Sequence, residues 1–334
     1  MRISFEEMKA EIKRVMLKAG LPEDKAEICA QTHTETSRDG VYSHGLNRVS
    51  RFYNYCKTGL VDPNGEIELV KKAGLMENYD GNLGVGITNA KFCSKRATEL
   101  ADEHGIGIVA LRNTTHWMRG GTYAWDIANE GMIGIIWTNT ESCMPVWGSK
   151  EVSVGNNPLC FGIPRQEGHI VLDMAMSQYS YGKLEVTRLA GEQLPFPGGF
   201  DKDGNLTSDP GSIEESLRIL PTGYWKGSGL AVALDVVGAI LSNGNCTSQM
   251  DVIDKGSCGS CSQVFIAIDP YIFASEEEVE TILKDTVNQI HNAAPVTEGR
   301  PPRYPGEGTL QARKTNNEQG ILVDEGVWEE VCSL

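Results

Sequence analysis

The chain has 334 residues, of which 40% are hydrophobic and 22% charged, and its formal net charge is −15. These values are typical of a soluble globular protein large enough for two lobes. The negative charge argues against binding to nucleic acid or to an anionic membrane, because both require a cationic surface. We therefore expect a small-molecule ligand, held by local clusters of Arg and Lys.

The ends and the cysteines indicate a cytoplasmic protein. The N-terminus lacks the apolar core of a signal peptide, and no apolar run reaches the length of a membrane span. The nine cysteines are odd in number and scattered, as expected for reduced thiols. Cys258-Gly259-Ser260-Cys261 is a C-x-x-C without a second ligand pair, so we expect a Gly/Ser loop there and no metal site.

The first 60 residues are predicted to be helical. Ser4 and Glu7 form a capping-box pattern ahead of apolar residues at helical spacing, which predicts a helix over residues 4–19 ended by Gly20. A second helix is expected after Pro22, and a third in the segment around His44, reaching residues 58–59.

Strands and helices alternate in the remainder of the chain. Short apolar runs bounded by turn residues predict the strands, and residues 193–210 form a long loop rich in Gly, Pro and Asp. The tail over residues 299–308 is expected to be irregular before a final short helix. The predicted strands lie within residues 67–79, 106–111, 132–137, 152–154, 159–163, 170–174 and 264–268, and the predicted helices cover residues 88–103, 121–129, 230–241 and 275–292.

Two polar segments could carry chemistry. If Ser43 caps a helix, His44 and Arg48 lie four residues apart on one face. An imidazole can transfer a proton near neutral pH and a guanidinium can hold a carboxylate, although a merely polar helix face has the same pattern. The second segment, residues 113–121, follows a predicted strand and contains His116 and Arg119. An ordinary connector is the alternative reading for it.

The sequence contains no standard dinucleotide fingerprint. Gly81-x-x-Gly84-x-Gly86 has the reversed glycine spacing and favours a loop. The segments 173–177 and 223–229 have the glycines, the charge of Lys226 and the flat ring of Trp225 that could meet a cofactor. A nicotinamide cofactor would therefore bind without a Rossmann turn.

Four longer motifs carry a resemblance to a known family. They are residues 40–45, 104–107, 116–121 and 219–229. Together they resemble the malate/L-lactate dehydrogenase family of nicotinamide-dependent oxidoreductases, over nearly the whole chain. The resemblance implies a mixed α/β fold with a largely antiparallel sheet, flanking helices and a helical N-terminal region. It also implies a non-Rossmann site for NAD in a homodimer.

The resemblance assigns roles to individual residues. It makes His44 the proton donor, with His116 as the alternative acid or base, and Arg48 is the expected carboxylate clamp. It divides the chain into a helical substrate and dimer region, residues 1–70 with about 290–334, and a cofactor-binding sheet domain, residues 71–289. The expected NAD-binding residues are His169, Ile170, Val171, Leu172, Asp173, Met174, Ala175, Trp225, Lys226, Gly306, Glu307 and Gly308.

The expected reaction is hydride transfer from NADH to the C2 ketone of a sugar-derived 2-oxo acid, with NADPH left open as the alternative cofactor. Three other functions remain open at this point. The protein could be a different 2-hydroxy-acid dehydrogenase, of the malate, L-lactate or ureidoglycolate type. It could also be a metal-dependent hydrolase using His44 and His116, or a non-catalytic sugar-acid binder.

Overall fold

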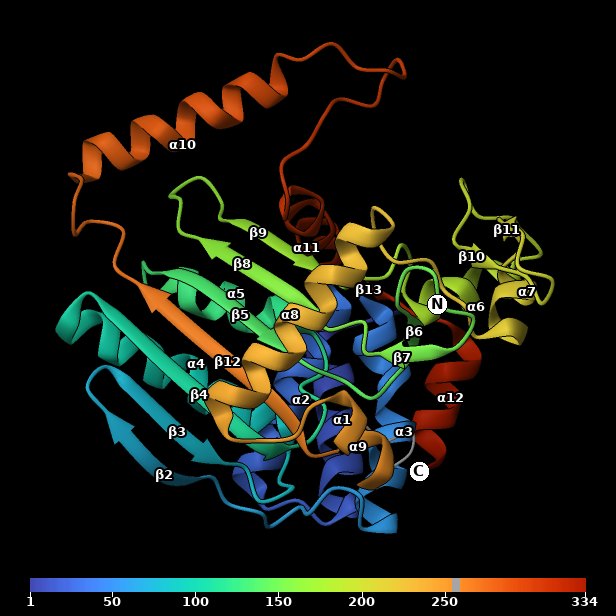
Figure 1. Cartoon of the computed structure of the whole chain (residues 1–334), viewed down its shortest axis with the longest axis horizontal. Helices are drawn as coiled ribbons and strands as arrows, with labels where there is room; N and C mark the ends of the chain where they lie inside the picture. The colour runs from blue at the N-terminus through green and yellow to red at the C-terminus, as the bar shows by residue number, and fades with distance from the viewer. Residues whose placement is uncertain (254–258) are drawn as a thin grey trace.

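The computed structural model describes residues 1–253 and 259–334, and its centre is a seven-stranded sheet (Figure 1). Only β3 and β4 pair in parallel among these strands, so the prediction of a mixed, largely antiparallel sheet is confirmed. The strands follow in the spatial order β2 (Glu68–Ala73), β3 (Met76–Asp80), β4 (Ile106–Thr114), β12 (Cys261–Ile268), β5 (Ile133–Thr138), β8 (Leu159–Ile163) and β9 (Ile170–Met174).

The central strand comes late in the sequence. β12 inserts between β4 and β5, and its Phe265 lies opposite Val109 on one side and Ile136 on the other. All three side chains are fully buried. A strand covered on both faces needs an almost continuous apolar run, which is why residues 264–268 were recognisable from sequence.

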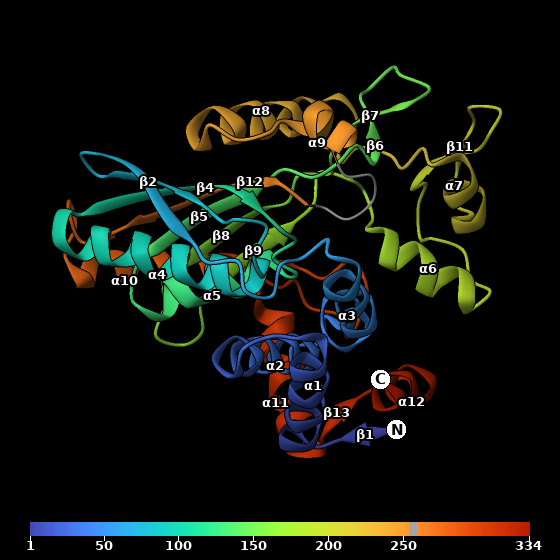
Figure 2. The same ribbon diagram turned by 90° about the horizontal axis from the view of Figure 1, so that it is seen from below.

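Helices cover both faces of the sheet (Figure 2). α4 (Gly86–His104) and α5 (Gly120–Asn129) pack on one face and enclose an apolar core around Trp117 and Phe265. α8 (Trp225–Ser242) lies across the other face, over β12, β4 and β5. The short α9 (Thr247–Ile253) follows it.

A separate helical core forms below the sheet in Figure 2. Ser4 caps α1 by accepting a hydrogen bond from the Glu7 N–H at 3.2 Å, and Gly20 ends the helix with φ of 105°, so both predicted ends are confirmed. The elements of this core are β1 (Arg2–Ile3), α1 (Phe5–Ala19), α2 (Glu23–Arg38), α3 (Val49–Thr58), β13 (Ile321–Leu322) and α12 (Glu325–Ser333). α11 (Glu307–Gln319) packs beside α2.

Several predicted boundaries were wrong. The third helix is preceded by two 3₁₀ turns, η1 (Tyr42–His44) and η2 (Leu46–Arg48), and only then becomes α3. α8 begins five residues earlier than predicted, and the C-terminal tail contains two helices where one was expected. The long loop holds a small hairpin between two helices that the sequence did not indicate. This lobe, at the right of Figure 1, comprises α6 (Tyr181–Leu189), β10 (Gly199–Phe200), β11 (Leu206–Thr207) and α7 (Pro210–Ser216).

Two remaining elements complete the chain. α10 (Glu276–His291) has the predicted capping box between Ser275 and Glu278, and Figure 1 shows it outside the main body, joined by two extended segments. β6 (Met144–Pro145) pairs with β7 (Val152–Val154). In the C-x-x-C motif, Cys258 lies outside the described residues, and Cys261 is the buried first residue of β12.

α8 corrects one expectation about the sequence. Its 18 residues are long and apolar enough to cross a membrane by length and composition, although no such run was expected. However, Asp235 near its middle is buried and accepts hydrogen bonds from Asn139 Nδ2 at 2.8 Å and the Thr247 N–H at 2.9 Å. One face of α8 therefore binds the sheet of this domain, while its apolar outer face is exposed.

Candidate active site

The segment around His44 is shaped by its contact with α2. Gly45 lies so close to α2 that a Cβ there would come within 2.2 Å of Ser37 Oγ, so only glycine fits. His33 of α2 donates its Nδ1–H to the Gly45 carbonyl at 3.0 Å, and Ser37 Oγ accepts from the Leu46 N–H at 2.8 Å. The predicted cap is wrong, since Ser43 Oγ lies 2.9 Å from His44 Nδ1 and caps no helix.

The loop after β4 brings the second histidine to the first. Trp117 and Met118 are both buried, but in different apolar cores. These two anchors fix the short loop that runs from the end of β4 to Met118. His116 then faces His44 with ring centroids 5.9 Å apart and planes at 22°. The N–H of Met118, a residue with φ of +66°, donates to His116 Nδ1 at 2.9 Å.

The surroundings of the two imidazole rings disfavour their protonation, because the rings are buried next to Arg48. Burial, together with the charges of Arg48 and Arg119, lowers the pKa of His44 to about 4, while the carboxylate of Asp173 acts in the opposite direction. The pKa of His116 falls well below its usual value because of burial, with Arg48 and His44 adding to the effect. Arg48 is therefore close enough for its charge to act on both imidazoles.

Asp173 near the end of β9 accepts two hydrogen bonds and has one arginine nearby. Its Oδ2 accepts from the Gly121 N–H at the start of α5 at 2.9 Å, and its Oδ1 accepts from Cys160 Sγ at 3.2 Å. Arg119 Nε lies 3.9 Å from Oδ2. The N–H groups in the first turn of a helix attract a negatively charged group, and the charge of this carboxylate acts on the neighbouring His44.

The three segments expected to bind the cofactor all meet edge strand β9. The Val171 N–H donates to the Pro305 carbonyl at 2.9 Å, next to Gly306. At the other end of the strand, the Thr222 N–H donates to the Met176 carbonyl at 2.8 Å, just before α8 begins at Trp225. β9 thus connects the start of α11 with the start of α8.

Individual residues of these segments differ in exposure. Trp225 and Lys226 are exposed, and Val171 is buried. His169 points toward α5, where its Nε2 lies 3.0 Å from Asn129 Oδ1. Glu307 accepts a hydrogen bond from the Tyr304 N–H at 3.2 Å. The others are half-buried: Ile170, Leu172, Met174, Ala175, Gly306 and Gly308, while Asp173 is exposed.

These residues fit a dinucleotide. Gly306 has φ of +95° and approaches β9 so closely that a Cβ would lie 3.0 Å from Val171 N. As the N-cap of α11 it contributes no side chain, so the first turn of that helix can offer N–H groups to a phosphate. The Lys226 ammonium and the exposed indole of Trp225 supply a charge and a flat surface at the start of α8.

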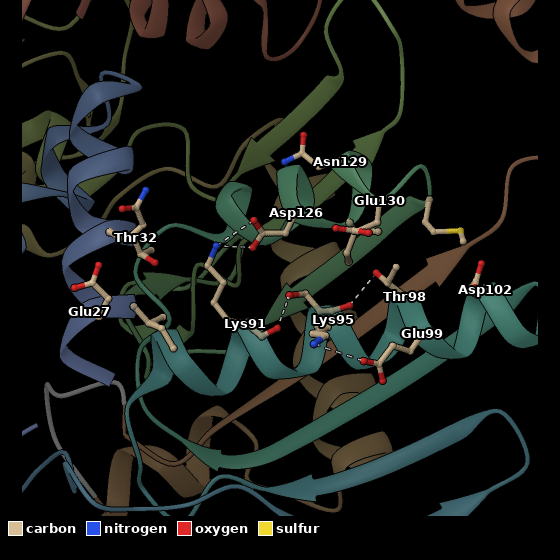
Figure 3. A pocket seen from close by; sticks show the side chains of 15 residues that line it. Glu27, Thr32, Lys91, Lys95, Thr98, Glu99, Asp102, Asp126, Asn129 and Glu130 are labelled. Carbon is tan, nitrogen blue, oxygen red and sulfur yellow. Dashed lines mark hydrogen bonds and ion pairs between the residues drawn. The ribbon is translucent and has the colours of Figure 1, made fainter. Parts of the chain in front are cut away.

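A large cavity lies apart from the two histidines. It has a volume of about 750 Å³ between α2, α4 and α5, and the ion pair of Lys91 with Asp126 crosses it (Figure 3). None of the site residues predicted from the sequence lines it within the described ranges. The predicted residues His44, Arg48 and His116 therefore lie together at a place outside this cavity.

Sequence and structure comparisons identify the family of this chain. The family model for malate/L-lactate dehydrogenase matches residues 3–332. The chain is 42% identical to 2,3-diketo-L-gulonate reductase of Escherichia fergusonii, with both chains covered in full. Among solved structures, sulfolactate dehydrogenase from Methanocaldococcus jannaschii has a TM-score of 0.89 and 31% identity, covering 100% of this chain and 97% of that one.

Malate dehydrogenase from Entamoeba histolytica superimposes with a TM-score of 0.94 at 25% identity, covering 100% of this chain and 96% of the other. These relatives are dehydrogenases and reductases, so the chain is an oxidoreductase, and the family implies a nicotinamide cofactor. The two histidines, the neighbouring arginine and the glycine-lined strand edge accord with this chemistry. The chain therefore belongs to the malate/L-lactate dehydrogenase family.

Proposed function

We propose that the protein reduces the C2 ketone of a sugar-derived 2-oxo acid with NADH, and that its substrate is 2,3-diketo-L-gulonate, converted to 3-dehydro-L-gulonate. The full-length similarity to 2,3-diketo-L-gulonate reductase supports this substrate. The observation that carries the reaction is the cluster of His44, Arg48 and His116 beside the Asp173 carboxylate of β9. It combines a proton donor with a carboxylate-binding cation in one partly buried site.

Arg48 is the group that binds the substrate carboxylate. A guanidinium donates two parallel hydrogen bonds to a carboxylate, which fixes both the position and the rotation of the ketone attached to it. Arg48 follows His44 by one 3₁₀ turn, and its charge acts on both imidazoles. A carboxylate bound there leaves the adjacent C2 oxygen within the histidine cluster.

His44 is the proton donor, and His116 is a neutral hydrogen-bond donor. Because the Met118 N–H donates to His116 Nδ1, that nitrogen needs a free lone pair, so a single proton resides on Nε2. If His116 Nδ1 were protonated, its N–H would point at the Met118 N–H, and neither donor would have an acceptor. His44 has no such restriction, since its Nδ1 meets a hydroxyl that can donate or accept. His44 therefore protonates the developing alkoxide while His116 polarises the carbonyl.

The bound nicotinamide supplies the hydride. The start of α11 and Lys226 would hold the phosphates of its dinucleotide, next to strand β9. NADH is favoured over NADPH because no arginine stands among the predicted cofactor-binding residues to meet a 2′-phosphate. Asp173 remains beside His44, where its charge favours the protonated imidazole.

We also propose a cytoplasmic homodimer that pairs α8 with its copy. The outer face of α8 exposes Leu230, Val236, Val237 and Ile240, with Gly229 and Ala233 among them. Such a stripe with small residues suits close packing of two helices in an isologous contact. Residues 1–70 with about 290–334 then form the substrate region. Residues 71–289 form the cofactor domain, which through α8 would also carry the dimer contact that the sequence analysis assigned to the substrate region.

A substrate panel tests the proposed function. Purified enzyme is assayed by loss of NADH absorbance with 2,3-diketo-L-gulonate, oxaloacetate, pyruvate and oxidised ureidoglycolate. The proposal requires the highest kcat/KM with 2,3-diketo-L-gulonate and a preference for NADH over NADPH. A higher value with another 2-oxo acid would replace the substrate and retain the reaction. Absence of NADH oxidation with all four would refute the proposed function.

A further inference from the structure

Asp39 at the end of α2 is surrounded by three arginines. It is 6% exposed. Arg313 of α11 donates from Nε and Nη2 to its two oxygens at 2.8 and 2.7 Å, and Arg119 Nη1 donates to Oδ2 at 2.8 Å. Arg38 adds longer contacts of 3.2 Å to Oδ1. The carboxylate thus joins the end of α2, the start of α5 and the middle of α11.

Arg119 connects this cluster to the candidate active site. Its side chain is 5% exposed, and while Nη1 bonds Asp39, Nε lies 3.9 Å from Asp173 Oδ2 without a hydrogen bond among the described residues. A buried guanidinium at that distance from a carboxylate would gain energy by closing the gap to a direct contact. The bond to Asp39 opposes this movement by fixing the other end of the same planar group.

We propose that Asp39 is a positioning residue: it holds Arg119 back from Asp173, and so leaves the Asp173 carboxylate available to the imidazole of His44. The inference rests on the proposed role of His44 as proton donor. Neither the sequence motifs nor the proposed mechanism uses Asp39. Asp39 also acts through its charge, because this negative charge balances the buried positive charge of Arg119. This effect does not depend on bound substrate.

The sign of the effect follows from the groups that face His44. These are Arg48 and His116 from their own segments, Asp173 from β9 and Arg119 from the start of α5. Among them only Asp173 favours the protonated ring. Loss of the Asp39 charge leaves Arg119 uncompensated and free to pair with Asp173, and both changes disfavour the imidazolium. The pKa of His44 must therefore fall.

The experiment uses Asp39→Asn in the full-length protein. The titration of His44 is followed by NMR of the imidazole nitrogens, and the His44 signals are assigned by their loss in His44→Ala. In addition, kcat is measured as a function of pH for both reduction and oxidation. We expect the His44 midpoint to fall by about one pH unit. Reduction, which needs the protonated ring, then loses about tenfold at neutral pH. Oxidation of the 2-hydroxy acid, which needs the neutral ring, is retained.

Two further variants separate positioning from folding. Arg119→Gln alone should raise the His44 midpoint. In the double variant with Asp39→Asn, the midpoint should return most of the way to its wild-type value. Glu77→Gln is the matched control. Glu77 of β3 is a buried carboxylate that accepts hydrogen bonds from Nε and Nη2 of Arg96, on α4, at 2.8 and 2.9 Å. It should lower thermal stability and leave the His44 midpoint unchanged.

Specific outcomes would overturn the inference. An unchanged or raised His44 midpoint in Asp39→Asn would do so. A fall in the double variant as large as that in Asp39→Asn alone would do so as well. Should Asp39→Asn fail to fold, an unchanged midpoint in Arg119→Gln would refute it independently. The NMR titration needs no substrate, so it tests the inference even if the panel of 2-oxo acids shows that the proposed function is wrong.

Discussion

Binding of a 2-oxo acid should draw a proton onto His44. With a pKa of about 4, only about one molecule in 10³ carries that proton at pH 7, although the reduction consumes it. A substrate carboxylate bound to Arg48 neutralises a cation that depresses this pKa, and it places an anion beside the ring. For His44 to be half protonated at pH 7, its pKa must rise by about three units, which corresponds to about 4 kcal/mol. An adjacent opposite charge contributes one to three units, so the required rise is attainable.

The assay is calorimetry of oxamate binding to the enzyme saturated with NADH. Oxamate has the carboxylate of a 2-oxo acid but an amide carbonyl that does not accept hydride. Titrations at pH 6 in two buffers with different heats of ionisation give the number of protons taken up. We expect close to one proton per site, and an affinity that weakens by about tenfold per pH unit between the free and liganded pKa values.

The pH limits of this effect follow from the sign of the shift. Below about pH 4 the free enzyme already carries the proton, so uptake should vanish there, and it should vanish again above the liganded pKa. His44→Ala should abolish uptake, whereas His116→Ala should preserve it because His116 stays neutral. Oxamate binding without proton uptake at pH 6, at unchanged affinity across this range, would refute the coupling between Arg48 and His44.

Three further substitutions test separate parts of the proposal. Arg48→Lys keeps the charge but loses the fork, so kcat/KM for a 2-oxo acid should fall by about 10² while NADH binding is unchanged; kinetics within twofold of wild type would remove Arg48 from the site. Lys226→Ala should weaken NADH by about tenfold in a fluorescence titration without altering substrate preference, and an unchanged Kd would reject its phosphate contact. Ile240→Asp, at a position that is 72% exposed, should convert a dimer into a folded monomer in sedimentation, and a surviving dimer would place the contact elsewhere.

Local sequence signals predicted the elements that are stabilised locally. The cap at Ser4 and the capping box at Ser275 involve residues three positions apart, so α1 and α10 begin where the pattern indicated. The buried strand β12 was equally recognisable, because both its faces are apolar. Its place between β4 and β5 was not, since strand order depends on contacts between residues more than 100 positions apart.

The candidate site shows the same division. The residue types at His44 and His116 indicated proton transfer, but the 3₁₀ turns that aim His44 arise from Gly45 docking on Ser37 of α2, which no spacing rule contains. Asp39 gave no signal at all. A carboxylate at a helix end resembles a solvated residue until folding brings Arg119 and Arg313 to it.

The most direct test of His44 as the proton donor is a comparison of kcat for His44→Ala and His116→Ala with the best 2-oxo acid at saturating NADH. Removing a positioned general acid typically costs about 10² to 10⁴, so His44→Ala should lose that factor with the Kd for NADH unchanged. His116→Ala should lose less, because it removes only a neutral hydrogen bond. A loss below tenfold for His44→Ala, with a larger loss for His116→Ala, would contradict the assignment and transfer the proton-donor role to His116.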